Sequence, residues 1–463
     1  MTAQPRSERR TGADATADAR LAAWTVQVRL ADIPEETRAW ARLVLLDAIA
    51  SALTGRRAEE RPAVARIADT LGGSGSSTVI GGRPRSLVGA TFLNAFQVTG
   101  ATICDVHRPT LCHVTPEVVP AALAAAASVG ASGEDLLVAA IVGFETTVRV
   151  ASSLTDRAFR DRGWHAPGIA GPFGAAAAAG RLLGLDPTTM GHAFGHAGGQ
   201  AAGTFAALGT SAVKFHQARG AVSGLLAALL AREGLDAAAA VLTAPMGGLL
   251  HAYAAGGQPD DLDDALGETW RFAELSLRRW PGASSVQALI EASLQAGDEL
   301  GTDVPDRVRV FLPPRSFVLS GSAGWSDELS ALQSARYIAA VVLRDRTCEL
   351  DQFDAAHRSD PGLSTFARDR VTVIEDGELS AAGARVVVER GDGAPASVGV
   401  EVPRGAPERP LGEADVIAKL ANACAALGRP ERAGPIAAAV FGLEQLAEVD
   451  DLLALLADPG SET

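Results

Sequence analysis

The sequence contains very little lysine. Of its 463 residues and 41 basic residues, only Lys214 and Lys419 are lysines, and all the others are arginines. Such an excess of Arg, together with abundant Ala and Gly, is typical of a coding preference, so a remaining lysine is a candidate for chemistry that arginine cannot perform. Lys214 stands just before an Ala/Leu-rich helical pattern over 221–232, where an ordinary surface lysine is the alternative interpretation. Lys419 lies in a polar-apolar helical pattern and is expected to be solvated.

Cysteine and long apolar runs are also scarce. The four cysteines show no C-x-x-C spacing, which indicates free thiols in a reducing compartment and predicts a cytoplasmic protein. No apolar run of membrane-spanning length is free of polar interruption, so no membrane partner is expected. Residues 1–19 are polar and charged, which predicts a disordered tail without an export signal.

Several signatures of cofactor and nucleic-acid binding are missing. The net charge of −14 argues against a nucleic-acid partner, although a local basic pocket for a small anionic substrate remains compatible with it. The glycine-rich segments lack the spacing of a phosphate-binding loop, and Gly-x-Ser-x-Gly does not occur between a strand and a helix. We therefore expect no cofactor.

The hydrophobic pattern predicts a mainly α protein in two domains. Helical periodicity dominates to about residue 270 and returns near the C-terminus. The expected domains are a helical domain formed by 20–272 and 411–463 and an α+β domain formed by 273–410. Polar-apolar alternation predicts strands at 304–312, 370–374, 384–389 and 397–402.

Histidines in Gly/Pro-rich segments carry the functional signal. They occur in Asp105-x-His107 with His113, in the segment around His165, and in Lys214-x-His216. Because histidine titrates near neutrality, such histidines suit proton transfer, while loop capping is the structural alternative.

A metal site built from Asp105, His107 and His113 is a competing hypothesis. His192 and His196 stand one helical turn apart, and helix packing is the preferred interpretation for them. Because there is no His-Glu-x-x-His motif and no cysteine pair, no metal is expected.

The order of these segments resembles the MmgE/PrpD family, which includes 2-methylcitrate dehydratase, cis-aconitate decarboxylase and iminodisuccinate epimerase. The resemblance covers roughly residues 20–456, and no single motif is diagnostic. The segments that carry it are Asp105-x-His107 with His113, Gly143-Phe-Glu145, Arg162-Gly-Trp-His165, Gly199-Gln-Ala-Ala-Gly203, Lys214-x-His216-x-x-Arg219 and Ser334-Ala-Arg-Tyr337.

The resemblance implies an active site in the cleft between a large helical domain and a smaller α+β domain, a homodimer, and cofactor-independent proton chemistry next to a carboxylate. By position it implies the catalytic residues Asp105, His107, His113, His165, Lys214 and Tyr337.

The chain departs from the family pattern after the helical domain. Arg278 stands where a lysine is usual, and Gln287 stands where a histidine is usual. The residues expected to bind substrate are Arg278, Arg279, His216 and Gln287. An arginine can still hold a carboxylate or phosphate through its planar fork.

These features predict a diverged lyase that removes a proton next to a carboxylate or carbonyl. We expect elimination of water, or of an activated oxygen such as phosphate, from a small acidic metabolite, for instance in a specialised biosynthetic pathway. Decarboxylation or epimerisation of a di- or tricarboxylate by the same carbanion chemistry is one alternative. A catalytically inactive binding paralogue is another.

Overall fold

The structure, a computed structural model, describes residues 16–301, 304–391, 394–458 and 460. Most of the predicted disordered tail, residues 1–15, lies outside this part of the chain. The tail prediction extends too far, because helix α1 (Ala17–Gln27) already begins inside it. The Thr16 side chain accepts a hydrogen bond from the Ala19 amide and so caps this helix.

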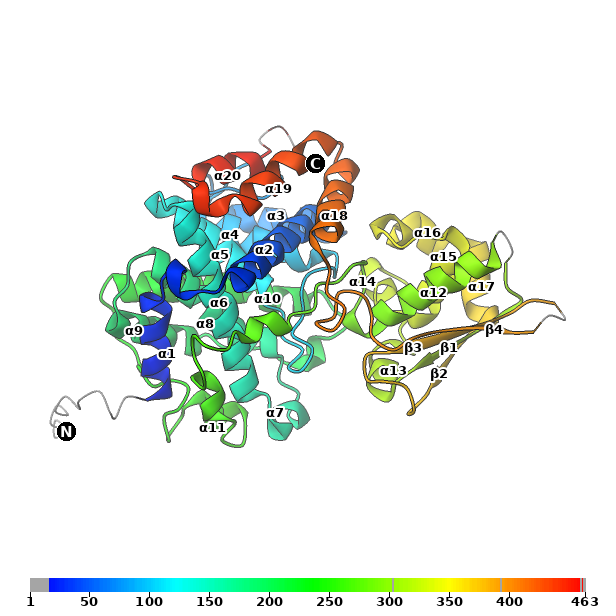
Figure 1. Cartoon of the computed structure of the whole chain (residues 1–463), viewed down its shortest axis with the longest axis horizontal. Coiled ribbons are helices and arrows are strands. Elements are labelled where there is room, and N and C mark those ends of the chain that lie inside the picture. The colour runs from blue at the N-terminus through cyan, green and yellow to red at the C-terminus, as the bar shows by residue number, and fades with distance from the viewer. Residues whose placement is uncertain (1–15, 302–303, 392–393, 459, 461–463) are drawn as a thin grey trace.

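The described chain forms two domains, one of helices only and one smaller with a sheet (Figure 1). The mainly α class and this division agree with the sequence-based prediction. The helices of the larger domain are α1, α2 (Glu35–Gly55), α3 (Arg61–Thr70), α4 (Leu87–Gly100), α5 (Thr115–Val129), α6 (Gly133–Leu154), α7 (Arg157–Asp161), α8 (Ala166–Leu182), α9 (Pro187–Gly198), α10 (Ala212–Arg232), α11 (Leu249–Tyr253), α18 (Glu413–Ala426), α19 (Ala433–Phe441) and α20 (Asp450–Leu456).

The smaller domain packs helices over a four-stranded sheet with the order β2-β1-β3-β4. Strand β1 (Arg307–Leu312) pairs in parallel with β2 (Val371–Glu375) and antiparallel with β3 (Ala384–Glu389), and β4 (Ala396–Val400) closes the far edge. Alternate residues of β1 are buried, as expected for a strand with one covered face. The helices of this domain are α12 (Gln287–Leu300), α13 (Pro314–Ser320), α14 (Glu328–Ala331), α15 (Ala335–Asp345), α16 (Ala355–Ser359) and α17 (Pro361–Arg370).

The last three helices lie on the helical domain, not on the sheet (Figure 1). Helices α18 and α19 both pack against α2. Leu420 of α18 and Leu452 of α20 belong to the same buried core as Leu46 of α2.

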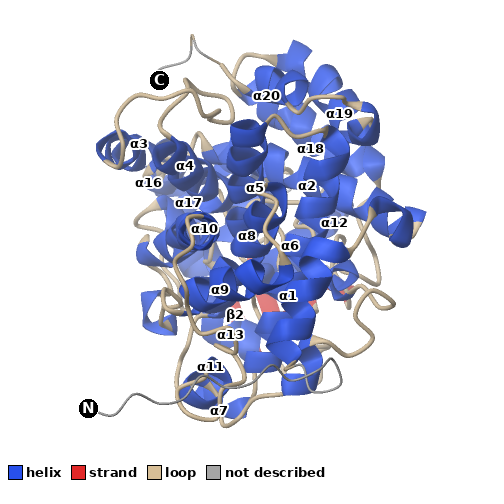
Figure 2. Ribbon diagram, turned by 90° about the vertical axis from the view of Figure 1, so that its left-hand side faces the viewer, coloured by secondary structure: helices blue, strands red, loops and turns tan. Residues whose placement is uncertain are grey.

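Helices α6, α8 and α10 form the closely packed centre of the large domain. In Figure 2 the helical domain faces the viewer and the strands lie behind it. Small residues permit the close approach. A Cβ at Gly174 of α8 would lie 1.8 Å from Thr147 Oγ1 of α6, and one at Gly224 of α10 would lie 2.4 Å from the Pro172 carbonyl oxygen of α8.

Helix α6 is also long and apolar enough to cross a membrane. In its apolar stretch of 18 residues, however, 94% of the residues are buried inside the protein. The helix therefore has the character of a core helix.

Helix α8 begins earlier than its sequence suggests. Gly171-Pro172 predicts a start at Phe173, but the helix starts at Ala166 and contains Pro172. A proline inside a helix leaves the carbonyl four residues earlier without its usual donor. Here that carbonyl, on Gly168, accepts hydrogen bonds from Arg219 Nη2 at 2.8 Å and from the Ala202 amide at 3.1 Å. The tertiary contacts therefore compensate for the proline.

The prediction of a solvated Lys419 is wrong. The residue is 3% exposed, and its Nζ donates to Asp47 Oδ1 at 2.6 Å, to the Ile103 carbonyl at 2.8 Å and to the Arg278 carbonyl at 3.3 Å. All three ammonium hydrogens thus have acceptors, so the charge can be buried. The lysine connects α18 and α2 to the segment that carries Arg278.

Candidate active site

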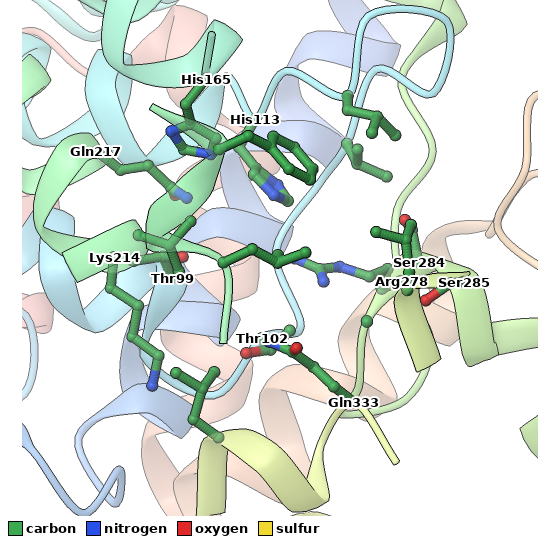
Figure 3. A pocket seen from close by; sticks show the side chains of 18 residues that line it. Thr99, Thr102, His113, His165, Lys214, Gln217, Arg278, Ser284, Ser285 and Gln333 are labelled. Atoms are coloured by element: carbon green, nitrogen blue, oxygen red, sulfur yellow. The ribbon is translucent and has the colours of Figure 1, made fainter. Parts of the chain in front are cut away.

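A cavity of about 110 Å³ lies between the two domains. Its lining from the helical domain includes Thr99, His113, His165, Lys214 and Gln217, and the α+β domain adds Ala283, Ser284, Ser285, Leu319, Leu329 and Gln333. Arg278 lies on the connection between them. Figure 3 shows His113 and His165 together at one end, with the Lys214 ammonium and Gln333 toward the other.

The hydrogen bonding of His113 determines which of its nitrogens can act as a base. His113 Nδ1 lies 2.6 Å from the Asp105 carbonyl oxygen. A carbonyl oxygen can only accept, so Nδ1 must carry the proton. The neutral ring therefore has its lone pair on Nε2, the nitrogen left for the cavity. This is the tautomer required of a proton acceptor.

Asp105 positions His113 without lining the cavity. Its buried carboxylate accepts hydrogen bonds from the amide of Val114 at 2.9 Å and from that of Thr115 at 3.1 Å, at the start of α5. The Thr115 hydroxyl adds a third bond. Burial raises the pKa of Asp105, and these hydrogen bonds act in the opposite direction. The carboxylate therefore holds the loop that presents His113.

His165 and His216 form a pair that leads away from the cavity. His165 stands at the residue before α8 and is 4% exposed. Its Nδ1 lies 3.2 Å from Nδ1 of the half-buried His216 on α10. A hydrogen bond between two such nitrogens contains a single proton, so one ring donates and the other accepts. If His165 accepts, its Nε2 carries a hydrogen that can be given to a ligand. His216 does not line the cavity, so it acts through His165.

Burial keeps both cavity histidines neutral. It lowers the pKa of His113 to about 3, with nearby Arg278 as the next cause. It also lowers the pKa of His165 to about 3, and there His216 and His113 contribute further. A bound carboxylate would favour the protonated rings and so raise both values.

Arg278 is arranged to hold a carboxylate. It is 3% exposed, and its Nε donates to the Cys104 carbonyl. Nη1 donates to the Gly282 carbonyl at 3.2 Å, and Nη2 to Cys104 Sγ at 3.2 Å. A guanidinium has five N–H groups, so one on each terminal nitrogen has no partner among the described residues. Two such hydrogens are what a bidentate carboxylate needs.

Two further predicted residues, His107 and Gln287, brace the site from outside the cavity. His107 lies 2.9 Å from Thr110 Oγ1 through Nδ1 and 3.2 Å from Glu274 Oε2 through Nε2, which ties down the 105–113 loop. The Gln287 amide group donates to the carbonyls of Trp280 and Gly282, just after Arg278.

Arg279 and Tyr337 point to other contacts. Arg279 pairs with Glu349 at 3.8 Å. Tyr337 is fully buried in the core of the α+β domain, where its hydroxyl donates to the Gln352 carbonyl at 2.6 Å. Burial raises its pKa. Neither side chain is among the described residues that line the cavity, because tertiary packing turns each one elsewhere.

Comparison with known proteins agrees with this architecture. The MmgE/PrpD N-terminal domain model matches residues 19–261, and the MmgE/PrpD C-terminal domain model matches residues 280–443. The chain belongs to the MmgE/PrpD family. Arg278 lies in the short segment between the two matched regions.

Curated relatives of this MmgE/PrpD protein include decarboxylases. A cis-aconitate decarboxylase-like protein of Aspergillus oryzae is 31% identical over 467 residues, covering 95% of this chain and 96% of its own. Cis-aconitate decarboxylase of Aspergillus terreus is 28% identical over 469 residues, covering 94% and 95%. The enzyme of that name from Homo sapiens is 26% identical over 269 residues, 55% of each chain. These relatives support an enzyme with a lyase-type role.

Lys214 of this MmgE/PrpD protein is bound by groups of the protein itself. It is 1% exposed and lies within α10. This helix begins at Ala212, whereas the sequence suggests a start after Lys214. Its Nζ donates to Glu60 Oε1 at 3.1 Å, to Glu60 Oε2 at 3.2 Å and to the Gly100 carbonyl at 2.7 Å. With all of its hydrogens accepted, the ammonium organises the floor of the cavity, and its stem lines the wall.

Replacement of Lys214 by alanine is expected to lower kcat/KM by ~10²-fold, because the loss of its contacts with Glu60 and the Gly100 carbonyl displaces the lining of the cavity. Arginine should restore little, since its planar fork does not match a site built around a compact ammonium. Steady-state kinetics of both variants, with circular dichroism as a folding check, test this. Full activity of Lys214→Arg would show that any positive charge is sufficient.

The structure adds lining residues that were not predicted. Gln217 stands one turn after Lys214 on α10, and its Oε1 is buried without a hydrogen-bond partner. The spacing of three residues along the helix was the available signal. Thr102 and Leu111 line the cavity with φ of 52° and 56°, a region that side chains seldom adopt and that occurs often at functional sites.

A metal centre receives no support from the geometry. Within residues 16–301, 304–391, 394–458 and 460, no group of three or more His, Cys, Asp or Glu side chains could hold a metal ion. Asp105 and His107 are occupied by the contacts given above. His192 Nδ1 and His196 Nε2 contact the carbonyls of Ala237 and Leu235, so this pair packs α9 against the 235–237 segment.

The pH profile of kcat/KM is expected to lack a histidine limb between about pH 5 and 8, where an ordinary histidine titrates. Because kcat/KM reports groups of the free enzyme, pKa values of about 3 for His113 and His165 keep both rings neutral down to acidic pH. A limb near pH 7 should come from Glu328, whose pKa burial raises to about 7 beside Lys214. Profiles of the wild type and Glu328→Gln decide this. A neutral limb that persists in Glu328→Gln would contradict the assignment.

Proposed function

We propose that this protein is a lyase that removes water, or a more activated oxygen group such as phosphate, from a small di- or tricarboxylate. The observation that carries the proposal is the tautomer of His113. Its Nδ1–H is held by the Asp105 carbonyl, which leaves Nε2 as an acceptor in a buried cavity. Elimination needs such a base next to a group that can bind a carboxylate, and Arg278 supplies that group.

In the proposed reaction, the two free N–H groups of Arg278 hold the substrate carboxylate. His113 Nε2 takes the proton from the carbon next to it, and the electron pair of that C–H bond becomes a carbon–carbon double bond. The bond to the leaving oxygen breaks, and His165 Nε2 gives its proton to that oxygen. As that proton leaves Nε2, the His216 Nδ1–H passes to His165 Nδ1, so His165 stays neutral. Water then takes up the proton held by His113 and returns one proton to the pair of His165 and His216, which resets the site. General acid and base each typically contribute about 10²- to 10⁴-fold.

Decarboxylation is the second candidate. The nearly full-length similarity to the Aspergillus decarboxylases favours it. In that reaction a carbon–carbon bond breaks, carbon dioxide leaves, and the remaining carbon takes a proton from His165. Each turnover then consumes one proton, which His216 can supply. Epimerisation would use the same two histidines on opposite faces of one carbon.

The experiment that separates these outcomes is proton NMR in deuterated water with a panel of hydroxy and unsaturated di- and tricarboxylates. Elimination predicts α-proton exchange with a new olefinic signal and unchanged carbon count. Decarboxylation predicts deuterium at carbon and release of carbon dioxide. If no compound exchanges or reacts but some bind, the function is that of an inactive binding paralogue.

We also propose that the protein is a cytoplasmic homodimer. The four free, buried cysteines are consistent with a reducing compartment, and the family resemblance implies the dimer. Light scattering at several protein concentrations tests the oligomeric state, and a monomer at all concentrations would refute it.

Catalysis is expected to survive EDTA, because proton transfer by histidines and charge stabilisation by Arg278 need no metal. Activity should change by less than about tenfold, the lower edge of an effect from a catalytic group. Metal analysis of the purified protein serves as the control. One tightly bound equivalent, with activity lost on its removal, would overturn the metal-free mechanism.

A further inference from the structure

A second, larger cavity adjoins the first. It measures about 480 Å³ against about 110 Å³ for the inner cavity. The two have Leu111, Ser284, Ser285 and Leu319 in common, so they adjoin at these residues. Ser284 and Ser285 mark the edge of the inner cavity in Figure 3. A substrate held at Arg278 therefore has room to extend outward past these serines.

Two arginines face this outer cavity from opposite domains. Arg108 belongs to the loop that presents His113, and Arg315 belongs to α13 of the α+β domain. Neither has a carboxylate within 4.0 Å among the described residues, in a chain whose net charge is −14. The hydrogen bond that Arg108 makes to the Ser284 carbonyl is a long one, at 3.5 Å from Nη2.

Few acidic side chains lie near these two guanidiniums to balance their charge. Burial lowers the pKa of Arg108, and Glu408 on the same cavity offsets this only in part. Burial and then neighbouring Arg160 lower the pKa of Arg315. The other acid on the cavity, Glu274, is bound by His107 at 3.2 Å. Arg108 is partly buried, so leaving its charge without an acidic partner is costly, whereas Arg315 is exposed and bears little of that cost. An oxyanion between the two domains would remove the cost at Arg108 and gain a contact with Arg315.

We propose that the outer cavity is a second anion site, in which Arg108 and Arg315 bind a carboxylate or phosphate at the distal end of the substrate. The proposal rests on the proposed function, which places the reacting carboxylate at Arg278. It defines the substrate class as an acid with a second oxyanion on a carbon chain long enough to reach from the inner to the outer cavity. The distal anion would also bridge the two domains.

Binding of simple chain compounds tests this without turnover. Calorimetry compares straight-chain α,ω-dicarboxylates, from succinate to sebacate, with monocarboxylates of equal length. At one chain length the dicarboxylate is expected to bind about tenfold or more tightly than its monocarboxylate, as a charge-assisted contact provides. Arg108→Ala and Arg315→Ala should each reduce that advantage, and the double variant should abolish it. Arg307→Ala, an exposed arginine on β1 of the same domain, should retain it.

An advantage that is absent from the wild type at every length, or that persists in the double variant, overturns the proposal. Phosphonate-terminated acids of the same lengths identify the anion: tighter binding than the dicarboxylate indicates phosphate, and equal or weaker binding indicates carboxylate. If Arg108→Ala does not fold, as judged by circular dichroism, Arg315→Ala alone decides. His113→Gln separates the two proposals, because it should lose turnover while retaining the chain-length advantage.

Discussion

Replacement of His113 by glutamine is expected to lower kcat by ~10²- to 10⁴-fold, the contribution typical of a general base. Glutamine has hydrogen-bonding groups but cannot take up a proton. The Asp105 carbonyl that orients His113 belongs to the backbone, so the substitution leaves the loop and the Asp105 carboxylate contacts in place. Single-turnover and steady-state rates measure the loss, and circular dichroism confirms that the variant is folded.

His192→Gln is the matched control for that substitution. His192 lies on α9 and contacts the Ala237 carbonyl at 2.9 Å, remote from the cavity lining. It should lose less than about tenfold in kcat, below the usual contribution of a proton-transfer group. If His192 proved essential and His113 dispensable, the active-site assignment would be wrong.

Replacement of Lys419 by methionine is expected to lower the free energy of unfolding by ~3–5 kcal/mol, the usual cost of leaving a buried charge without its partner. Asp47 is fully buried in α2, and its Oδ2 has no hydrogen-bond partner even in the wild type. Without Lys419 its carboxylate loses the contact at 2.6 Å. Urea denaturation followed by circular dichroism measures the change.

The double variant Asp47→Leu/Lys419→Met provides the control. Apolar residues of similar volume avoid the desolvation of both charges, so the pair should cost less than the single substitution. Activity should fall further than stability predicts, because Lys419 also donates to the carbonyls of Ile103 and Arg278. A double variant as unstable as Lys419→Met would show that the pair contributes more than its burial costs.

The predicted element types agree with the structure where the pattern is local. The four expected strands match β1–β4 closely, because alternation within a strand depends only on adjacent residues. The predicted start of α8 was wrong because a proline such as Pro172 is normally incompatible with a helix interior. Here Arg219 of α10 and the Ala202 amide donate to the carbonyl that the proline leaves without a donor. The predicted start of α10 was also too late: the helix follows Ser211, whose side chain makes no capping hydrogen bond.

For the site, sequence order was enough to identify the chemical groups but not their orientation. His113, His165, Lys214 and Arg278 all line the cavity. Asp105, His107 and Gln287 lie behind it and hold the loops, whereas Tyr337 is part of a core. Sequence cannot separate these groups, because each lies in a segment that passes near the cavity.

The sequence by itself determined the family, the two-domain mainly α fold and the residue types available for proton transfer and anion binding, since these follow from local periodicity and from the order of the segments. Only the tertiary structure decided which side chains are free to act. Lys419 meets Asp47 across 372 residues of sequence, and Lys214 meets Glu60 across 154. Whether a charge is solvated, paired or open to a ligand depends on such distant partners, and so does the tautomer that makes His113 a base.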